Sequence, residues 1–206
     1  MKKRILVLFA HPALEKSRVN RVLIEGLDRR EGITFHDLYE TYPDLDIDVK
    51  HEQELLSAHD VIVFHHPFYW YSTPAILKEW LDLVLEHGWA YGSEGNALKG
   101  KWFINVITTG GREKAYCEIG SNRFTVRQLL APLEQTACLC KMLFLPPFVV
   151  HGSLGISRDE VLKHREDLHD LYDTLINADI DIDKIAPLHR INADMSLVLD
   201  KLQITG

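Results

Sequence analysis

The chain has 206 residues, of which 46% are hydrophobic and 26% are charged, and its formal net charge is −7. This length suffices for one well-buried domain and is short for two. The acidic balance argues against a nucleic-acid groove, which needs a clustered basic face. No signal segment precedes the first apolar run, and no apolar stretch reaches the roughly 20 residues that span a bilayer. We therefore expect a cytoplasmic protein without a nucleic-acid partner.

The cysteines and acidic residues predict no metal site. Cys117, Cys138 and Cys140 cannot all pair, and the last two are too close in sequence for a normal bridge, which indicates a reducing compartment. Their spacing is not that of metal ligands, so buried core thiols are expected. Residues 44–48 begin like a calcium loop but lack its glycine and its bidentate glutamate.

Five apolar runs predict the strands of a buried parallel sheet. They cover residues 5–10, 33–38, 61–65, 102–108 and 143–150. Helical periodicity lies between them, over residues 19–27, 76–85, 124–139 and 158–176. Ser17 is expected to cap the first of these helices, and Thr73 with Pro74 to begin the second.

This alternation predicts an α/β fold with right-handed crossovers and helices on both faces of the sheet. Five strands favour the flavodoxin-like, doubly wound order 2-1-3-4-5. We assign this flavodoxin-like domain to residues 1–178. Neither an internal repeat nor a low-complexity linker interrupts it.

Residues 179–206 form a predicted C-terminal tail. Residues 179–183, followed by Pro187, predict an extended connection. A short amphipathic helix is predicted from Met195, Val198, Leu199 and Leu202. The tail is expected to pack on the parent domain or on a dimer mate, and the alternative is a docking element for another protein.

Ligands of doubly wound folds bind beyond the carboxyl ends of the strands. After the first strand, Ser17 can cap a helix whose first amides, those of Arg18, Val19 and Asn20, have no intrahelical partner. Such amides favour an anion, with His11 and the side chains of Ser17 and Asn20 as further donors. The segment therefore predicts a phosphate site, although an ordinary capped helix would explain it alone.

Two further strand ends carry unusual loops. The loop after the third strand holds four aromatic residues, which favour the walls of a flat pocket: Phe68, Tyr69, Trp70 and Tyr71. The loop after the fourth strand lets the backbone approach a ligand and offers amides to a ring that becomes negative on reduction: Thr108, Thr109, Gly110 and Gly111. Together, the three loops predict a flavin nucleotide, a planar ring with a phosphorylated tail.

Several motifs then carry a family resemblance, which runs from about residue 4 to residue 176. They are Ala10-His11-Pro12 with Ser17 and Asn20, His66-Pro67-x-x-Trp70-Tyr71-Ser72, His87-Gly88-Trp89-Ala90-Tyr91-Gly92, Leu98-x-Gly100-Lys101, Thr108-Thr109-Gly110-Gly111 and Leu145-Pro146-Pro147-Phe148. The sequence resembles the flavodoxin-fold NAD(P)H:quinone reductases, and among them the bacterial ancillary proteins of glutathione-gated potassium efflux systems. This resemblance implies a homodimer with two interfacial flavin sites, in which Tyr91 reaches the site of the opposite chain.

The resemblance also implies a reaction. NADH or NADPH would give a hydride to the flavin, and a quinone entering the same slot would then take two electrons, in a ping-pong sequence. In larger reductases of the family, a tyrosine and a histidine after the Gly-Gly pair assist charge relay. Tyr116 stands at the tyrosine position, whereas Asn122 stands at the histidine position and cannot carry a proton at neutral pH. This departure implies slower turnover or proton delivery by water, unless Tyr116 is only a mobile loop aromatic.

Three functional hypotheses follow. The first is a flavin-dependent quinone oxidoreductase that uses FMN, with FAD as the alternative cofactor. The second is a regulatory subunit that docks on a membrane potassium efflux protein, at the inner face of the membrane. The third is a one-electron carrier, which is disfavoured because the sequence supplies no acidic surround for a flavin.

Overall fold

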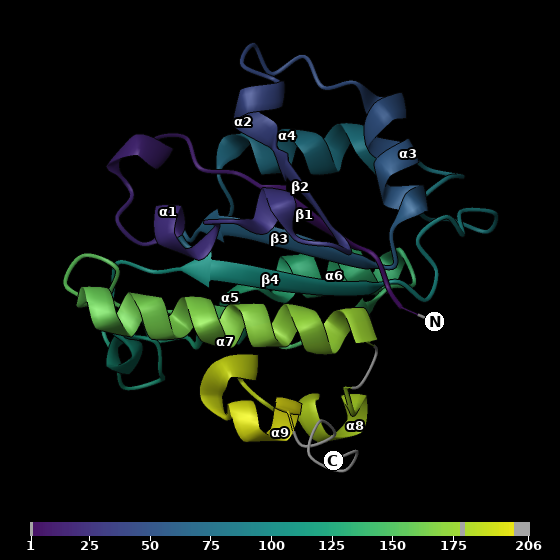
Figure 1. Cartoon of the computed structure of the whole chain (residues 1–206). Helices are drawn as coiled ribbons and strands as arrows, with labels where there is room; N and C mark the ends of the chain where they lie inside the picture. The colour runs from purple at the N-terminus through teal and green to yellow at the C-terminus, as the bar shows by residue number, and fades with distance from the viewer. Residues whose placement is uncertain (1, 178–179, 200–206) are drawn as a thin grey trace.

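The computed structural model, which describes residues 2–177 and 180–199, has a parallel sheet between two layers of helices (Figure 1). The strands are β1 (Ile5–Phe9), β2 (Ile33–Asp37), β3 (Val61–Pro67), β4 (Trp102–Thr108), β5 (Leu143–Phe144) and β6 (Phe148–Val150). Their hydrogen-bonded order is β2-β1-β3-β4-β5, and β6 also pairs with β4. The predicted flavodoxin-like fold and strand order are confirmed.

The last predicted strand, residues 143–150, is two short strands. Leu143 of β5 pairs with Trp102 of β4, and Phe148 of β6 pairs with Val106 of β4, so β5 and β6 lie along the same edge of β4. Pro146 and Pro147 fall between them. Proline has no N–H to give to a neighbouring strand, which explains why the ladder is interrupted there.

Helices cover both faces. The α-helices are α1 (Asn20–Leu23), α2 (Leu38–Thr41), α3 (Val49–Ala58), α4 (Ala75–Val84), α5 (Val126–Leu129), α6 (Ala131–Leu139), α7 (Arg158–Asn177), α8 (Ile182–Ile185) and α9 (Met195–Leu199). The apolar side chains of α2 to α6 pack in one cluster, and those of α1 and α7 to α9 pack in the other. Within the described residues, no helix has both the length and the apolar character needed to cross a membrane.

Two predicted helices are shorter than expected. The first, predicted over residues 19–27, is the four-residue α1, which ends at Leu23. Gly26 has a left-handed φ of 84°, which excludes a continuous helix up to residue 27. The helix predicted over residues 124–139 is divided into α5 and α6 at Leu130, with a proline in the first turn of α6. Pro74 precedes α4 and no side chain caps that helix, so the predicted Thr73 cap is wrong.

The tail packs on its own domain. Ile180, Ile185, Ile191 and Val198 are buried in the cluster that contains α7 and β6. The predicted extended connection is wrong over Ile182–Ile185, because the Asp181 side chain accepts the Lys184 N–H and begins α8. The amphipathic helix is present as α9, but Leu202 and the proposed boundary at residue 179 lie outside the described residues.

The three cysteines differ in how far they are buried. Cys140 is buried as expected, whereas Cys117 is half-buried and Cys138 is exposed. The expectation of three core thiols is therefore wrong for two of them. Cys138 lies near the end of α6, where the helix turns its side chain to solvent.

A buried carboxylate joins α3 to the rest of the molecule. Glu52 is completely inaccessible and accepts hydrogen bonds from Tyr42 Oη at 2.6 Å and Trp80 Nε1 at 2.8 Å, and it contacts His36 Nε2 at 2.7 Å. Burial raises the pKa of Glu52, but the hydrogen bonds from His36, Tyr42 and Trp80 outweigh it and hold the pKa below its ordinary value. No helix was predicted over Val49–Ala58, because this inward-facing residue is charged and interrupts the apolar pattern.

We expect Glu52→Ala to lower the free energy of unfolding by about 3 kcal/mol, because it leaves the buried donors of Tyr42 and Trp80 without an acceptor. The lowered pKa means that the Glu52 contribution is present above its unfolded pKa of about 4.3 and is lost as the pH falls through the folded value. Urea denaturation at pH 7 measures the change. Glu54→Ala, at an exposed position of the same helix, is the control and should stay within about 0.5 kcal/mol of wild type.

Candidate functional site

A cavity of about 490 Å³ lies at the carboxyl ends of the strands. Its walls include many of the predicted cofactor residues: His11, Ser17, Arg18, Val19, Asn20, Phe68, Tyr69, Thr108 and Gly110. The structure therefore brings the loops after β1, β3 and β4 together. Trp70, Tyr71, Thr109 and Gly111 are not part of this wall.

One wall of the cavity was not predicted. Ser153 and Leu154 also line the cavity, and they belong to the loop after β6. The signal was available in the predicted strand order, because the fifth strand neighbours the fourth and its loop must emerge at the same edge of the sheet.

A single side-chain amide connects the loop after β1 to the end of β4. Asn20 is 2% exposed, and its Nδ2 donates to Ser17 Oγ at 3.1 Å and to Thr108 Oγ1 at 3.0 Å. The Asn20 main-chain N–H also donates to Ser17 Oγ, at 3.1 Å. The N-cap of α1 is Val19 and has no side-chain cap, so Ser17 is not the predicted cap of this helix and accepts the Asn20 N–H from the turn before it. The turn is thus held by buried hydrogen bonds instead of by a long helix.

Main-chain donors without acceptors lie in the cavity wall. Among hydrogen bonds between described residues, the N–H groups of the wall residues Arg18, Val19 and Gly110 have no acceptor, and neither does that of Gly111, the next residue. Asn20 Oδ1 is also buried there without a partner in the described part of the chain. Unpaired N–H groups favour an anion, and a buried unpaired oxygen favours a hydroxyl donor. A phosphate ester of a polyol supplies both groups.

His11 is a neutral donor at the cavity wall. Its Nδ1 accepts the Ala13 N–H at 3.2 Å, so the proton of the neutral ring lies on Nε2. Burial lowers the pKa of His11, although Glu15 and the main chain of His11 itself partly oppose this. The ring lies edge-on to Tyr69, with centroids 6.1 Å apart.

The aromatic loop divides into an inner and an outer pair. Phe68 is buried and Tyr69 is half-exposed, and both line the cavity. Trp70 and Tyr71 have φ of 50° and 63°, and the Ser72 N–H donates to the Tyr69 carbonyl at 3.0 Å, which is the geometry of a type I′ turn. This turn carries Trp70 away from the cavity, where it is 94% exposed.

Tyr116 and Asn122, the predicted catalytic residues, lie on the segment after Gly111, and neither lines this cavity. Tyr116 instead lines a separate cavity of about 360 Å³, together with His151. Tyr71 Oη donates to Asn122 Oδ1 at 3.2 Å. A Cβ at Gly111 would lie 3.2 Å from the Tyr116 ring, so glycine permits this close packing. Burial raises the pKa of Tyr116, which keeps its phenol protonated at neutral pH, while side-chain hydrogen bonding by Thr109 and Asn122 opposes the shift.

Tyr91, the residue expected to act in the partner's site, does not line this cavity. Its ring packs against His87 at 5.3 Å between centroids, and its main-chain carbonyl accepts the Gly88 N–H. Nothing in a single chain brings Tyr91 to the cavity, so its predicted role in the partner's site stays a prediction.

The end of β3 buries two imidazoles. His65 and His66 are inaccessible and lie on opposite faces of the strand, as expected from their alternation. Burial lowers the pKa of His65 to about 3 and that of His66 to about 4, so both are neutral. The described residues contain no group of three histidine, cysteine or acidic side chains that could hold a metal ion.

Comparison with known proteins agrees with this geometry. The model of the Flavodoxin_2 family, described as a flavodoxin-like fold, matches residues 3–176. The glutathione-regulated potassium-efflux system ancillary protein KefG of Pectobacterium carotovorum is 50% identical over 156 residues, which cover 76% of this chain and 85% of the relative.

Two solved structures are also similar. General stress protein 14 of Treponema denticola, in complex with FMN, is 37% identical with a TM-score of 0.80, covering 84% of this chain and 99% of that one. An NADPH-quinone reductase from P. pentosaceus is 32% identical with a TM-score of 0.74, covering 81% and 96%. The resemblance predicted from the motifs is confirmed, and the chain belongs to the Flavodoxin_2 family of flavodoxin-like fold.

Proposed function

We propose that the protein is an FMN-dependent NAD(P)H:quinone oxidoreductase. The observation that carries this proposal is the cavity itself, in which free main-chain N–H groups from the loops after β1 and β4 face an aromatic wall from the loop after β3. The similarity to an FMN complex and to an NADPH-quinone reductase supports the same cofactor and reaction class.

The residues fit the two ends of FMN. The N–H groups of Arg18 and Val19, with Ser17, would hold the phosphate, and Asn20 Oδ1 would accept a hydroxyl of the ribityl chain. Phe68 and Tyr69 would flank the ring. When bound, the flavin supplies the hydride chemistry, accepting electrons from NADH or NADPH and returning them to a quinone in ping-pong order.

The remaining residues would control charge and protons. The N–H groups of Gly110 and Gly111 would stabilise negative charge that develops on the ring. Tyr116, which burial keeps protonated, would donate a hydrogen bond or a proton to the reduced acceptor. Asn122 orients Tyr71 and can only donate or accept hydrogen bonds.

We further propose that the enzyme is a homodimer. The type I′ turn exposes Trp70. Leu154, which lines the cavity, is 84% exposed, and Ile119, on the segment after Gly111, is 97% exposed. A second chain would cover these apolar groups and place its Tyr91 over the flavin. FAD is the alternative cofactor, and Arg18 and Arg158, which line a further cavity, would hold its extra nucleotide.

A second function is favoured by a specific observation, the 50% identity to a potassium-efflux ancillary protein. We propose that the enzyme also docks on a membrane potassium efflux protein at the cytoplasmic face and regulates it. The two roles are compatible, because the cavity occupies only one edge of the sheet.

Purified protein should carry or bind FMN and oxidise NADH or NADPH with a quinone. Asn20→Asp should weaken FMN binding about 100-fold, because it replaces the donor to Ser17 and Thr108 with a negative charge beside the phosphate. Quenching of flavin fluorescence measures the affinity. Asn96→Asp, on an exposed loop where Lys141 contacts the side chain, should bind FMN like wild type. A colourless protein that neither binds FMN nor oxidises NAD(P)H contradicts the enzymatic proposal.

Tyr116→Phe should slow quinone reduction about 100-fold and leave FMN affinity within about twofold of wild type, because it removes only the phenol hydroxyl. Stopped-flow oxidation of the reduced enzyme by a quinone measures this step. Tyr71→Phe removes the hydrogen bond to Asn122 and should have a much smaller effect. Equal rates for the Tyr116 and Tyr71 variants would argue that the phenol of Tyr116 is not used.

Deleting the gene from a cell that holds the efflux protein should reduce potassium efflux, and expressing the chain again should restore it. Asn20→Asp tests whether flavin binding matters for regulation. Efflux that is unchanged by deletion, with the protein absent from washed membranes, contradicts the ancillary role and leaves the enzymatic proposal intact.

A further inference from the structure

A cavity of about 680 Å³ adjoins the cavity at the carboxyl ends of the strands, and the two share Ser17 and Arg18 in their walls. It lies on the face of the sheet where α1 and α7 pack against each other (Figure 1). Its walls are formed by Ser17, Arg18, Arg21, Val22, Glu25, Arg158 and Val161. A ligand in this cavity therefore lies next to the main-chain N–H groups that would hold the FMN phosphate.

Three guanidinium groups line this arginine cavity, and they come from two segments. Arg18 and Arg21 lie in the turn after β1 and in α1, and Arg158 is the first residue of α7. Within residues 2–177 and 180–199, none of the three forms an ion pair. Arg18 Nη2 donates to the Ile156 carbonyl at 3.3 Å, which is a neutral acceptor. Three guanidinium groups without carboxylate partners favour an anionic ligand.

The carboxylate in the wall of the arginine cavity does not balance these charges. Of the described residues that line the cavity, only Glu25 is acidic. Glu25 Oε2 accepts a hydrogen bond from Arg165 Nη1 at 2.6 Å, and Arg165 does not belong to the wall. The negative charge of Glu25 is therefore already paired with a fourth arginine.

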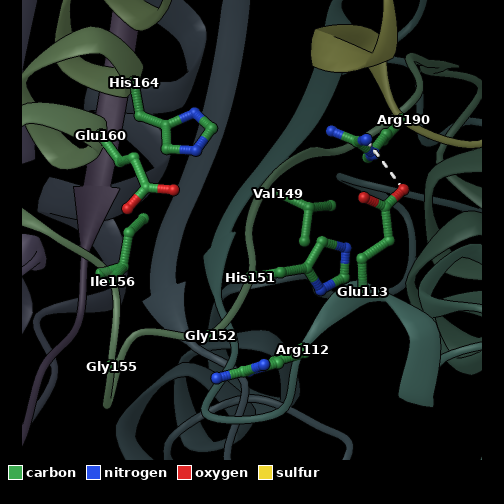
Figure 2. Close-up of a pocket in the computed structure, with 10 residues that line it drawn as sticks. All are labelled: Arg112, Glu113, Val149, His151, Gly152, Gly155, Ile156, Glu160, His164 and Arg190. Atoms are coloured by element: carbon green, nitrogen blue, oxygen red, sulfur yellow. Dashed lines mark hydrogen bonds and ion pairs between the residues drawn. The ribbon is translucent and has the colours of Figure 1, made fainter.

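The cavity shown in Figure 2, of about 470 Å³, has no such excess of positive charge. Two arginines line it, Arg112 and Arg190, but Arg190 donates to Glu113 at 2.8 Å. Glu160 adds a second carboxylate from α7. The two imidazoles in its wall are neutral at pH 7, because burial lowers the pKa of each. Two arginines and two glutamates balance, so this cavity does not select a strongly anionic group.

We propose that Arg18, Arg21 and Arg158 bind the 2′-phosphate of NADPH and make NADPH the preferred electron donor. The inference rests on the proposed function, with FMN as the cofactor. NADPH differs from NADH only in this phosphate monoester, which carries close to two negative charges at neutral pH. Arginine binds such a group through paired hydrogen bonds that also orient it, and it is the residue that accommodates the 2′-phosphate in other dinucleotide sites.

The position of the arginine cavity agrees with the path of a bound donor. The nicotinamide must lie against the flavin ring for hydride transfer, at the aromatic wall of Phe68 and Tyr69. A dinucleotide that runs from the ring along the FMN tail reaches Ser17 and Arg18, which both cavities share. Its adenosine then lies in the arginine cavity, and Arg21 lines that cavity without lining the first one.

Charge also distinguishes the donor from the alternative cofactor. Beyond the phosphate of FMN, FAD adds one phosphate with a single negative charge and a neutral adenosine. NADPH adds a diphosphate and the doubly charged 2′-phosphate. Three guanidinium groups match the second set of charges better than the first.

Steady-state reduction of a quinone with each donor tests the proposal. The wild-type enzyme should prefer NADPH to NADH about 10-fold or more in kcat/KM. Arg21→Gln and Arg158→Gln should each lower kcat/KM for NADPH about 10-fold, mainly through KM, and leave the value for NADH within about twofold. Both arginines are exposed, so neither substitution should affect folding. Arg112→Gln, at an exposed arginine of the cavity in Figure 2, is the matched control and should change neither value.

Titration calorimetry of the FMN-loaded protein gives a readout without turnover. Adenosine 2′,5′-bisphosphate should bind about 10-fold more tightly than adenosine 5′-monophosphate, and the difference should disappear in the double variant Arg21→Gln/Arg158→Gln.

Equal affinity for the two adenosine phosphates, equal kcat/KM for the two donors, or an NADPH preference that survives both substitutions overturns the donor site and leaves the oxidoreductase proposal intact. Release of FAD from the wild-type protein, with flavin lost from the arginine variants, also overturns the donor site, because the cavity then holds the nucleotide of FAD. A wild-type protein that oxidises neither donor overturns the proposed function and the donor site together.

Discussion

The geometry of the candidate site depends on one buried amide. Asn20 lies after β1 and reaches Thr108 at the end of β4, although β3 separates these strands in the sheet. Because the amide is 2% exposed, water does not compete for its bonds to Thr108 and Ser17. The bonds fix the distance between the free N–H groups of Arg18 and Val19 and those of Gly110 and Gly111. A phosphate at one end and a ring at the other can therefore be held without a glycine-rich phosphate loop.

Apolar periodicity predicted the sheet and the long helices because their buried residues are apolar. It gave β4 and most of α7 with their observed bounds, and the alternation of strands with helices was enough for the strand order. Apolar periodicity did not predict α3, because one of the inward-facing residues of this helix is the charged Glu52. The Tyr42, Trp80 and His36 partners that make this burial favourable come from distant segments, so no local pattern shows them.

The parts of the candidate site that lie within single loops could be predicted from the sequence. The loops after three strands could be chosen from the strand order and their residue types, and most of their members do line one cavity. The direction of Trp70 was not predictable, since two consecutive positive φ angles in a sequence without glycine give no compositional signal. The contact of His151 with Thr109 joins residues 42 positions apart and required the fold itself.

The C-terminal tail packs against β6 and the loop after β4, although its sequence resembles that of a separate segment. β6 is an edge strand, and Asn192 pairs with Val149 in both directions, Nδ2 to the carbonyl and Oδ1 to the N–H, each at 3.0 Å. These bonds give the edge strand β6 the hydrogen-bond partners that a further strand would supply.

Two arginines hold the tail in that position. Arg127 donates to the Ala186 and Leu188 carbonyls, and Arg190 donates to Glu113 in the loop after β4. Because Val149 is two residues before His151, the tail fixes the wall that carries this imidazole. Any partner that displaces the tail would therefore change the surroundings of His151 without touching the cavity at the carboxyl ends of the strands.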